Sequence, residues 1–99
     1  MDININAAIK RFVAAAQAVV DTVDHGGRKV LTVYGGVRYA RVELSFENGG
    51  SSRSAYCYVE YSTGNILRAV GMRGPTRHVV GNVYSGNPTE GLGPHGANL

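Results

Sequence analysis

Tyrosine and arginine side chains recur at short intervals in the middle of the chain. Tyr39 and Arg41 lie two positions apart, as do Tyr56 and Tyr58. Arg68 follows in the next short segment, residues 65–70. Tyrosine rings can stack on any nucleobase, and arginine binds phosphates through its forked guanidinium. If these side chains share one exposed surface, we expect a platform that binds single-stranded nucleic acid with little dependence on its base sequence.

The complete set of candidate ligands adds further arginines to these rings. The predicted nucleic-acid-binding residues are Tyr39, Arg41, Arg53, Tyr56, Tyr58, Arg68, Arg73 and Arg77. We expect the substitutions Tyr56→Ala and Arg68→Ala to weaken binding without unfolding the protein. Two other interpretations of the rings stay open. They could pair across strands and only stabilise a sheet, or they could form a subunit interface, where tyrosine and arginine are also enriched.

Positive charge is concentrated in the middle of the chain. The 99 residues carry a net charge of +3, with a pI near 9.3. Residues 28–77 hold eight basic residues against three glutamates, a net charge of +5, whereas residues 1–27 and residues 78–99 each carry −1. This distribution favours an anionic partner for the middle segment. A charged surface that only keeps the protein in solution has the same composition and stays open as an alternative.

An amphipathic helix is predicted over residues 4–24. Apolar residues recur at helical spacing and form one stripe, which consists of Ile5, Ile9, Phe12, Val13, Ala16, Val19, Val20 and Val23. Asn4 or Asp2 would cap the N-terminus. The pair Gly26 and Gly27 would cap the C-terminus, because glycine adopts the left-handed conformation without steric cost. The stripe needs an apolar surface to cover, and a sheet in the following residues would provide it.

Four strands are predicted after the helix, over residues 29–34, 37–46, 53–61 and 65–70. Polar and apolar residues alternate along them, and glycine-containing turns separate them. The inward face would carry Ala40, Val42, Leu44, Phe46, Ala55, Cys57 and Val59. The outward face would carry Tyr39, Arg41, Glu43, Ser45, Ser54, Tyr56, Tyr58 and Glu60. We therefore predict an α+β fold in which an N-terminal amphipathic helix packs on a four-stranded antiparallel meander.

Residues 71–99 differ from the preceding chain in composition. They hold seven of the fourteen glycines and all three prolines. Their apolar residues form only one small patch, at Val79, Val80 and Val83. We predict a helix-plus-sheet domain over residues 1–70, followed by an extended or partly disordered C-terminal arm over residues 71–99.

Residues for catalysis or metal binding are scarce. Cys57 is the single cysteine, which excludes an intramolecular disulfide, and His25, His78 and His95 have no partner at metal-ligand spacing. The chain has no glycine-rich phosphate loop and no paired carboxylates for acid–base chemistry. We expect a protein that is not an enzyme, with no cofactor, no bound metal and no small-molecule substrate.

The sequence also bears on the compartment. No apolar run reaches the roughly 18 residues of a membrane-spanning helix. The N-terminus lacks the apolar block of a signal peptide, and the helical segment has too few basic residues for a helix that lies on a membrane surface. We therefore expect no membrane partner and a reducing cytoplasm as the compartment.

One segment resembles a pattern in small proteins of microvirus-type single-stranded DNA phages. That pattern is Gly-Asp/Asn-Ile, a basic residue and Ala, then a basic stretch with Pro, then Gly-Asn-Ile/Val. The matching residues are Gly64, Asn65, Ile66, Arg68, Ala69, Arg73, Pro75, Arg77, Gly81, Asn82 and Val83, and residues 93–99 are similar to the Gly-Pro/Tyr-Gly-Ala endings of these proteins. Met72 departs from the pattern, which often has Trp there, and so does Gly74, which replaces Ala. The match covers about a third of the chain.

This resemblance implies a viral protein that handles single-stranded DNA in the host cytoplasm or in association with the virion. The resemblance and the positions of the arginines both point to residues 64–77, where Arg68, Arg73 and Arg77 could bind a phosphate backbone. We expect a homo-oligomer, a dimer in the first instance, that binds single-stranded nucleic acid. The alternative is a non-enzymatic viral structural or host-interaction protein, in which the tyrosine face contacts another subunit or a partner protein.

Overall fold

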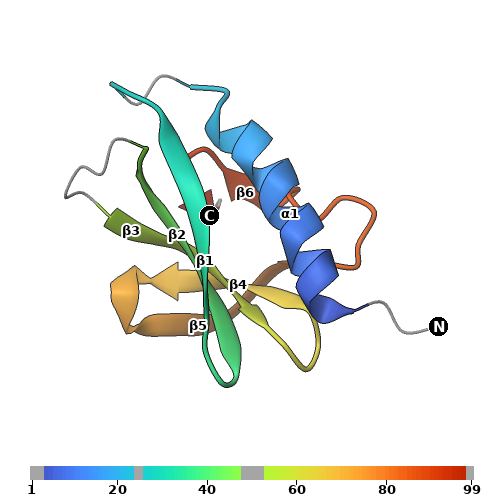
Figure 1. The fold of residues 1–99 in the computed structure, drawn as a ribbon. Helices are drawn as coiled ribbons and strands as arrows, with labels where there is room; N and C mark the ends of the chain where they lie inside the picture. The colour runs from blue at the N-terminus through green and yellow to red at the C-terminus, as the bar shows by residue number, and fades with distance from the viewer. Residues whose placement is uncertain (1–3, 24–25, 48–52, 98–99) are drawn as a thin grey trace.

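The computed structural model describes residues 4–23, 26–47 and 53–97 and has an α+β fold (Figure 1). One helix, α1 (Ile5–Val20), precedes an antiparallel sheet of five strands, which are β1 (Lys29–Gly35), β2 (Tyr39–Phe46), β3 (Arg53–Glu60), β4 (Asn65–Val70) and β5 (Gly74–Asn82). A short 3-10 helix, η1 (Gly71–Arg73), joins β4 to β5. A hairpin of β6 (Leu92–Gly93) and β7 (Gly96–Ala97) follows. The predicted α+β class, with one N-terminal helix and an antiparallel sheet, is confirmed.

Helix α1 begins where Asn4 caps it. The Asn4 side chain accepts a hydrogen bond from the backbone N–H of Asn6 (2.8 Å), as an N-cap residue does. The other predicted cap, Asp2, lies outside the described residues. Within those residues no helix combines the length and the apolar character that a membrane crossing requires.

The C-terminal end of α1 differs from the prediction. The helix ends at Val20 instead of residue 24, and its C-cap is Asp21 in place of the glycines at positions 26–27. The Thr22 hydroxyl donates to the backbone carbonyl of Val19 (2.7 Å) and so satisfies one of the free carbonyls of the last turn. A side chain close in sequence therefore completes this helix, and no glycine is needed there.

Helix α1 is tied to the edge of the sheet by one side chain. The Gln17 amide donates to the backbone carbonyl of Lys29 (2.9 Å) and accepts from the backbone N–H of Leu31 (2.9 Å). It thus occupies hydrogen-bonding groups on the outer edge of β1 that a neighbouring strand would otherwise use. This contact places the helix beside β1.

The sheet is a meander with the strand order β1-β2-β3-β4-β5. The prediction of four strands is corrected to five, because residues 74–82 form β5 along the free edge of β4, with Leu67 opposite Val79. The predicted arm therefore contains a strand of the main sheet. Gly74 and Pro75 at its start obscured the strand pattern. Proline is tolerated here because β5 is an edge strand.

A second layer covers one face of the sheet. Helix α1 and β6 lie side by side in this layer (Figure 1). The buried core consists of Ala8, Ile9, Phe12, Ala16, Val20, Ala40, Val42, Leu44, Tyr56, Cys57, Val59, Ile66, Val83 and Leu92. Val83 and Leu92 come from the segment that was predicted as an arm. By contrast, Phe46 of the predicted inward face is only half-buried, and Val23 of the predicted helix stripe is exposed.

Candidate nucleic-acid interface

Tyr56 lies in the core and not on an exposed face. Glu43 of β2 pairs with Ala55, whereas the residue before Glu43 pairs with Cys57, so the register skips Tyr56. This bulge interrupts the alternation of faces along β3 and brings Tyr56 into the same core cluster as Cys57. Tyr56 is 1% exposed. The prediction that it faces water is therefore wrong, and its ring is not available to a base.

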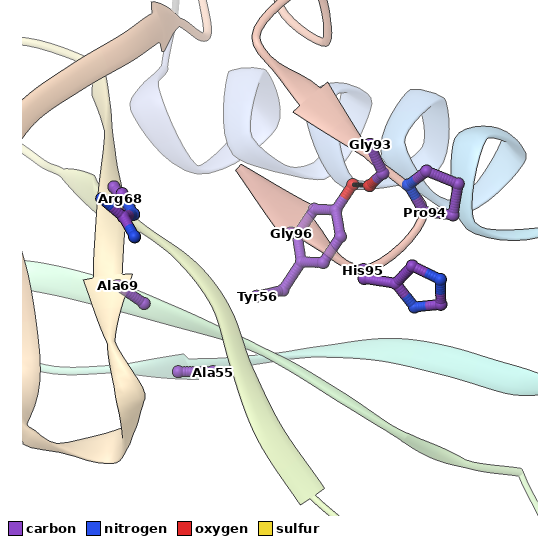
Figure 2. Close-up of a pocket in the computed structure, with 8 residues that line it drawn as sticks. All are labelled: Ala55, Tyr56, Arg68, Ala69, Gly93, Pro94, His95 and Gly96. Atoms are coloured by element: carbon purple, nitrogen blue, oxygen red, sulfur yellow. Dashed lines mark hydrogen bonds between the residues drawn. The ribbon is translucent and has the colours of Figure 1, made fainter. Parts of the chain in front are cut away.

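The buried hydroxyl of Tyr56 connects two parts of the fold. It donates to the backbone carbonyl of Gly93 (2.8 Å) and holds the β6–β7 hairpin against β3 (Figure 2). Burial raises the pKa of this hydroxyl, and the neighbouring Cys57 adds a smaller contribution. Burial also raises the pKa of the Cys57 thiol. Both groups thus stay protonated in the fold and act as parts of the core.

Tyr58 stays on the sheet face opposite the core but is also buried. It is 5% exposed, so the prediction that it faces water is wrong. Its ring meets the half-buried Tyr39 ring edge to face, with centroids 6.4 Å apart and planes at 83°. In the sheet register Tyr58 is flanked by Arg41 of β2 and Leu67 of β4. These contacts fit the interpretation in which the rings stabilise the sheet.

A buried carboxylate partners the two arginines beside these rings. Glu43, predicted to face water, is 2% exposed. Arg41 Nε donates to Glu43 Oε2 (2.7 Å), and Arg53 Nη1 lies 3.9 Å from Glu43 Oε1. Among the described residues, Oε1 has no hydrogen-bond partner and only this longer contact. A phosphate at this position would have to compete with Glu43 for both guanidinium groups.

The three remaining candidate arginines lie on the segment from β4 to β5, which we call the basic hairpin (residues 65–82). Arg68 is half-buried in β4, whereas Arg73 in η1 and Arg77 in β5 are exposed. The chain between Glu60 and Glu90 contains no aspartate and no glutamate. Within the described part of the chain, none of these three arginines forms an ion pair. The arginines that do are Arg28, Arg38, Arg41 and Arg53. The positive charge of the basic hairpin is therefore not neutralised by neighbouring carboxylates of the described residues.

Two glycines shape the tip of the basic hairpin. Gly71 has a φ of +53° and Gly74 a φ of +151°, a region that favours glycine. Between them, η1 presents Arg73 together with Met72, which is 41% exposed. Val79 on β5 is 50% exposed. Val79 belongs to the apolar patch that the sequence indicates, whereas the exposure of Met72 was not predicted, although its position between two glycines is typical of a turn.

The base of the basic hairpin is held by Asn82. Its side-chain amide donates to the backbone carbonyl of Thr63 (2.9 Å) and to Asn65 Oδ1 (3.0 Å), and its Oδ1 accepts from the backbone N–H of Tyr84 (2.8 Å). Gly64 has a φ of +76°, and a Cβ there would lie 2.7 Å from the Tyr84 ring. Three residues of the phage-like pattern, Gly64, Asn65 and Asn82, thus position the ends of β4 and β5.

A pocket of about 290 Å³ lies where β3 and β4 meet the β6–β7 hairpin (Figure 2). Tyr56, Arg68 and Ala69 line it from the sheet, and residues 93–96 line it from the turn between β6 and β7. Arg68 and His95 stand on opposite sides of this pocket. Nothing in the sequence connects these two residues. Only the packing of β7 against β3 and β4 brings them to the same pocket.

Neither a metal-ligand cluster nor a known relative identifies a function. In the part of the chain that the structure describes, no three His, Cys, Asp or Glu side chains come together as metal ligands would. Comparisons of the chain with protein-family models, with curated proteins and with solved structures find no match.

Proposed function

We propose that this protein binds single-stranded nucleic acid, with DNA preferred, through phosphate contacts along the basic hairpin. One observation carries the proposal. Arg68, Arg73 and Arg77 lie together on β4–η1–β5 with no carboxylate partner among the described residues. A guanidinium that is not engaged within the protein can form two parallel hydrogen bonds to a phosphate. Each phosphate contact also releases condensed counterions, which favours binding.

Apolar side chains beside the arginines support a single strand as the ligand. Met72 and Val79 are exposed on the same hairpin. Unpaired bases offer apolar faces that such side chains can contact, whereas the bases of a duplex are stacked on each other. The resemblance to microvirus-type phage proteins covers this segment and is the reason to prefer DNA over RNA.

The proposed surface replaces most of the tyrosine platform that the sequence predicts. Tyr56 and Tyr58 are excluded as base-stacking residues by burial, and Tyr39 is half-buried against Tyr58. Arg41 and Arg53 already contact Glu43. The basic hairpin therefore takes the main role, and the tyrosine face is assigned to the stability of the sheet.

A matched pair of double variants tests the proposal. Arg73→Ala with Arg77→Ala removes two arginines of the basic hairpin for which the described residues provide no carboxylate partner. Arg28→Ala with Arg38→Ala removes two exposed arginines that have carboxylate partners elsewhere. Both variants lower the net charge by two, so they separate the position of the charge from its amount. Binding of a fluorescent single-stranded DNA oligonucleotide is followed by anisotropy over a series of salt concentrations.

We expect the hairpin variant to bind at least about tenfold more weakly, and the slope of log affinity against log salt to fall by about 1.4, because each phosphate contact on a single strand contributes about 0.7. The control variant should stay close to the unmodified protein in both quantities. Equal losses in the two variants, or no binding by the unmodified protein at low salt, would contradict the proposal.

The second candidate function is that of a non-enzymatic structural or host-interaction protein. The position of β5 as an edge strand, together with the exposed side chains of Val70 and Val79, favours it. An unpaired strand edge can add a strand from another chain, such as a second copy of this protein. This candidate is preferred if sedimentation shows an oligomer that Val79→Lys dissociates, while the oligonucleotide does not bind.

A further inference from the structure

The outer edge of β1 is covered along only part of its length. The Gln17 side chain bonds to the Lys29 carbonyl (2.9 Å) and to the Leu31 N–H (2.9 Å), so it takes the place of a neighbouring strand there. Helix α1 and β1 then run apart toward the turn between β1 and β2 (Figure 1). The last four residues of β1, residues 32–35, are exposed. This part of the sheet edge is therefore open to another strand.

The pairing of β1 with β2 shows which backbone groups this open edge offers. The Gly36 N–H donates to the Tyr39 carbonyl (3.0 Å), and in this register the even-numbered residues of β1 bond to β2. The odd-numbered residues point their backbone groups outward, and the last two of them are Val33 and Gly35. Among the described residues, no hydrogen bond occupies the N–H and C=O groups of these two residues. A partner strand can therefore pair with them without disturbing the sheet.

An apolar pocket of about 230 Å³ lies beside the open edge. Ile9 and Val13 line it from α1, and Val33, Ala40 and Tyr61 line it from the sheet and the turn after β3. An apolar cavity of about 150 Å³ holds a benzene-sized group, so this pocket has room for one large apolar side chain. Paired residues of adjacent strands direct their side chains to the same face. A partner residue opposite Val33 would thus have its side chain at the pocket.

The charge beside the pocket favours an acidic partner. Lys10 is exposed and lines the pocket, together with Asn6. Among the described residues, Lys10 has no carboxylate partner, and no aspartate or glutamate lines the pocket. Side chains two positions apart on a strand share a face. An acidic residue two positions from the apolar one would therefore lie on the side of Lys10.

The same charge disfavours a second copy of this chain as the added strand. The other edge strand of the sheet is β5, which carries Arg77 and directly follows Arg73. Its pairing with β1 of another copy would bring arginines toward Lys10, and like charges on adjacent strands destabilise their pairing. A strand of another protein with acidic residues avoids this repulsion.

We propose that residues 32–35 and the adjoining pocket bind an extended segment of a partner protein, in which an apolar residue has an acidic residue two positions away. Hydrogen bonds to the backbone of Val33 and Gly35 supply affinity, and the pocket and Lys10 supply selectivity. The basic hairpin lies at the opposite edge of the sheet. This proposal does not rest on the proposed function.

A palindromic peptide tests the proposal on the full chain, because it offers the same pattern in either strand direction. The probe is acetyl-Ser-Thr-Glu-Val-Leu-Val-Glu-Thr-Ser-amide. One control peptide has serine in place of leucine, and a second has lysine in place of both glutamates. NMR titration gives the affinities, and hydrogen exchange follows the backbone N–H groups of Leu31, Val33 and Gly35.

We expect the probe at saturation to slow exchange at Val33 and Gly35 by at least about tenfold. Exchange at Leu31 should stay unchanged, because Gln17 already holds this N–H. The serine peptide should bind at least about tenfold more weakly, since it leaves the apolar pocket unfilled. The lysine peptide should bind about fivefold more weakly, because an exposed ion pair contributes little.

Two variants separate the roles of the edge and of the charge. Val33→Pro removes an outward N–H, a position at which an edge strand tolerates proline, and should weaken binding of the probe at least about tenfold. Lys10→Glu should reverse the preference, so that the lysine peptide binds more tightly than the probe. Arg11→Glu is the matched control and should keep the preference, because Arg11 is exposed on the same helix but does not line the pocket. Lys10→Glu keeps the test valid if Val33→Pro does not fold.

Three outcomes would overturn the proposal. The first is unchanged exchange at Val33 and Gly35 in the presence of the probe. The second is an equal effect of Lys10→Glu and Arg11→Glu on the choice between the peptides. The third is slow exchange at both N–H groups without peptide that becomes fast on dilution, which would show that a second copy occupies the edge. None of these readouts involves the oligonucleotide, so failure here leaves the proposed function standing.

Discussion

The tyrosine face on β2 and β3 and the basic hairpin on β4–η1–β5 are both rich in arginine, yet their electrostatic environments differ. On the tyrosine face, Arg41 and Arg53 share the carboxylate of Glu43, with the closer nitrogen at 2.7 Å and the farther one at 3.9 Å. On the basic hairpin, Arg73 and Arg77 are exposed, and the described residues offer them no carboxylate. The same side chain is therefore a structural ion-pair partner in one region and a candidate phosphate ligand in the other.

Burial explains why the two regions diverge. Glu43 is nearly inaccessible to solvent, and a buried carboxylate needs a cationic partner to remain charged. Its two arginines are thereby committed to the fold. The basic hairpin lies at the edge of the sheet, where exposed cations are hydrated and need no internal partner. Position in the sheet, more than residue type, thus separates binding candidates from structural residues.

The largest expected effect tests whether the buried ring of Tyr56 belongs to the core. Tyr56→Ala removes a ring that is 1% exposed and its hydrogen bond to Gly93. We expect a loss of about 3–5 kcal/mol in the free energy of unfolding, measured by urea denaturation. This replaces the earlier expectation that the variant stays folded. A variant of normal stability that no longer binds the oligonucleotide would return Tyr56 to the binding surface.

The second prediction concerns the carboxylate that neutralises the tyrosine face. Glu43→Gln leaves Arg41 and Arg53 without their shared anion. We expect a loss of about 1–3 kcal/mol in the free energy of unfolding. This is below the range for a fully buried pair, because the side chains of Arg41 and Arg53 are 36% and 60% exposed and solvent screens them. Arg38→Ala, which removes a more exposed partner of Glu60, is the control and should cost under about 1 kcal/mol. Equal losses in the two variants would show that Glu43 contributes no more to stability than an exposed ion pair does.

The third prediction uses the raised pKa of Cys57 and of Tyr56. The usual pKa values are 9.0 for the thiol and 10.0 for the phenol. Below pH 9 both states of the protein keep the thiol proton. As the pH rises above 9, the unfolded chain releases it while the folded chain retains it, so the free energy of unfolding falls. Each such group contributes up to about 1.4 kcal/mol per pH unit.

Urea denaturation between pH 8 and pH 10 measures this slope, and Cys57→Ala is the comparison. The variant should lose the part of the slope that begins near pH 9, whatever its stability at neutral pH. Identical slopes in the two proteins would show that burial does not raise the pKa of the Cys57 thiol.

The smallest expected effect concerns the base of the basic hairpin. Asn82→Ala removes hydrogen bonds to Thr63, Asn65 and the backbone of Tyr84. These contacts are exposed or half-buried, so we expect a loss of about 1 kcal/mol in the free energy of unfolding. We also expect faster amide hydrogen exchange in β5 than in β2. Unchanged exchange in β5 would show that strand pairing alone holds the hairpin.

Local features of this fold could be predicted from short stretches of sequence. The Asn4 cap and most of the apolar stripe of α1 follow from helical spacing, and the first four strands follow from alternation and from glycine turns. The concentration of arginine in the middle segment is likewise visible without a structure. Of the candidate site, Arg68, Arg73 and Arg77 were named from the sequence and lie on one hairpin in the structure, and their role in binding stays a prediction.

The α+β class, the amphipathic helix and the excess of positive charge in residues 28–77 could be predicted from the sequence, because each depends on residues close together in the chain. By contrast, the burial of Tyr56 and Tyr58, the fifth strand at residues 74–82 and the pocket lined by Arg68 and His95 became apparent only in the folded structure. The reason is physical. A one-residue bulge in β3 changes the face to which Tyr56 turns. The partner of an edge strand and the walls of a pocket depend on contacts between residues far apart in sequence, which no local pattern specifies.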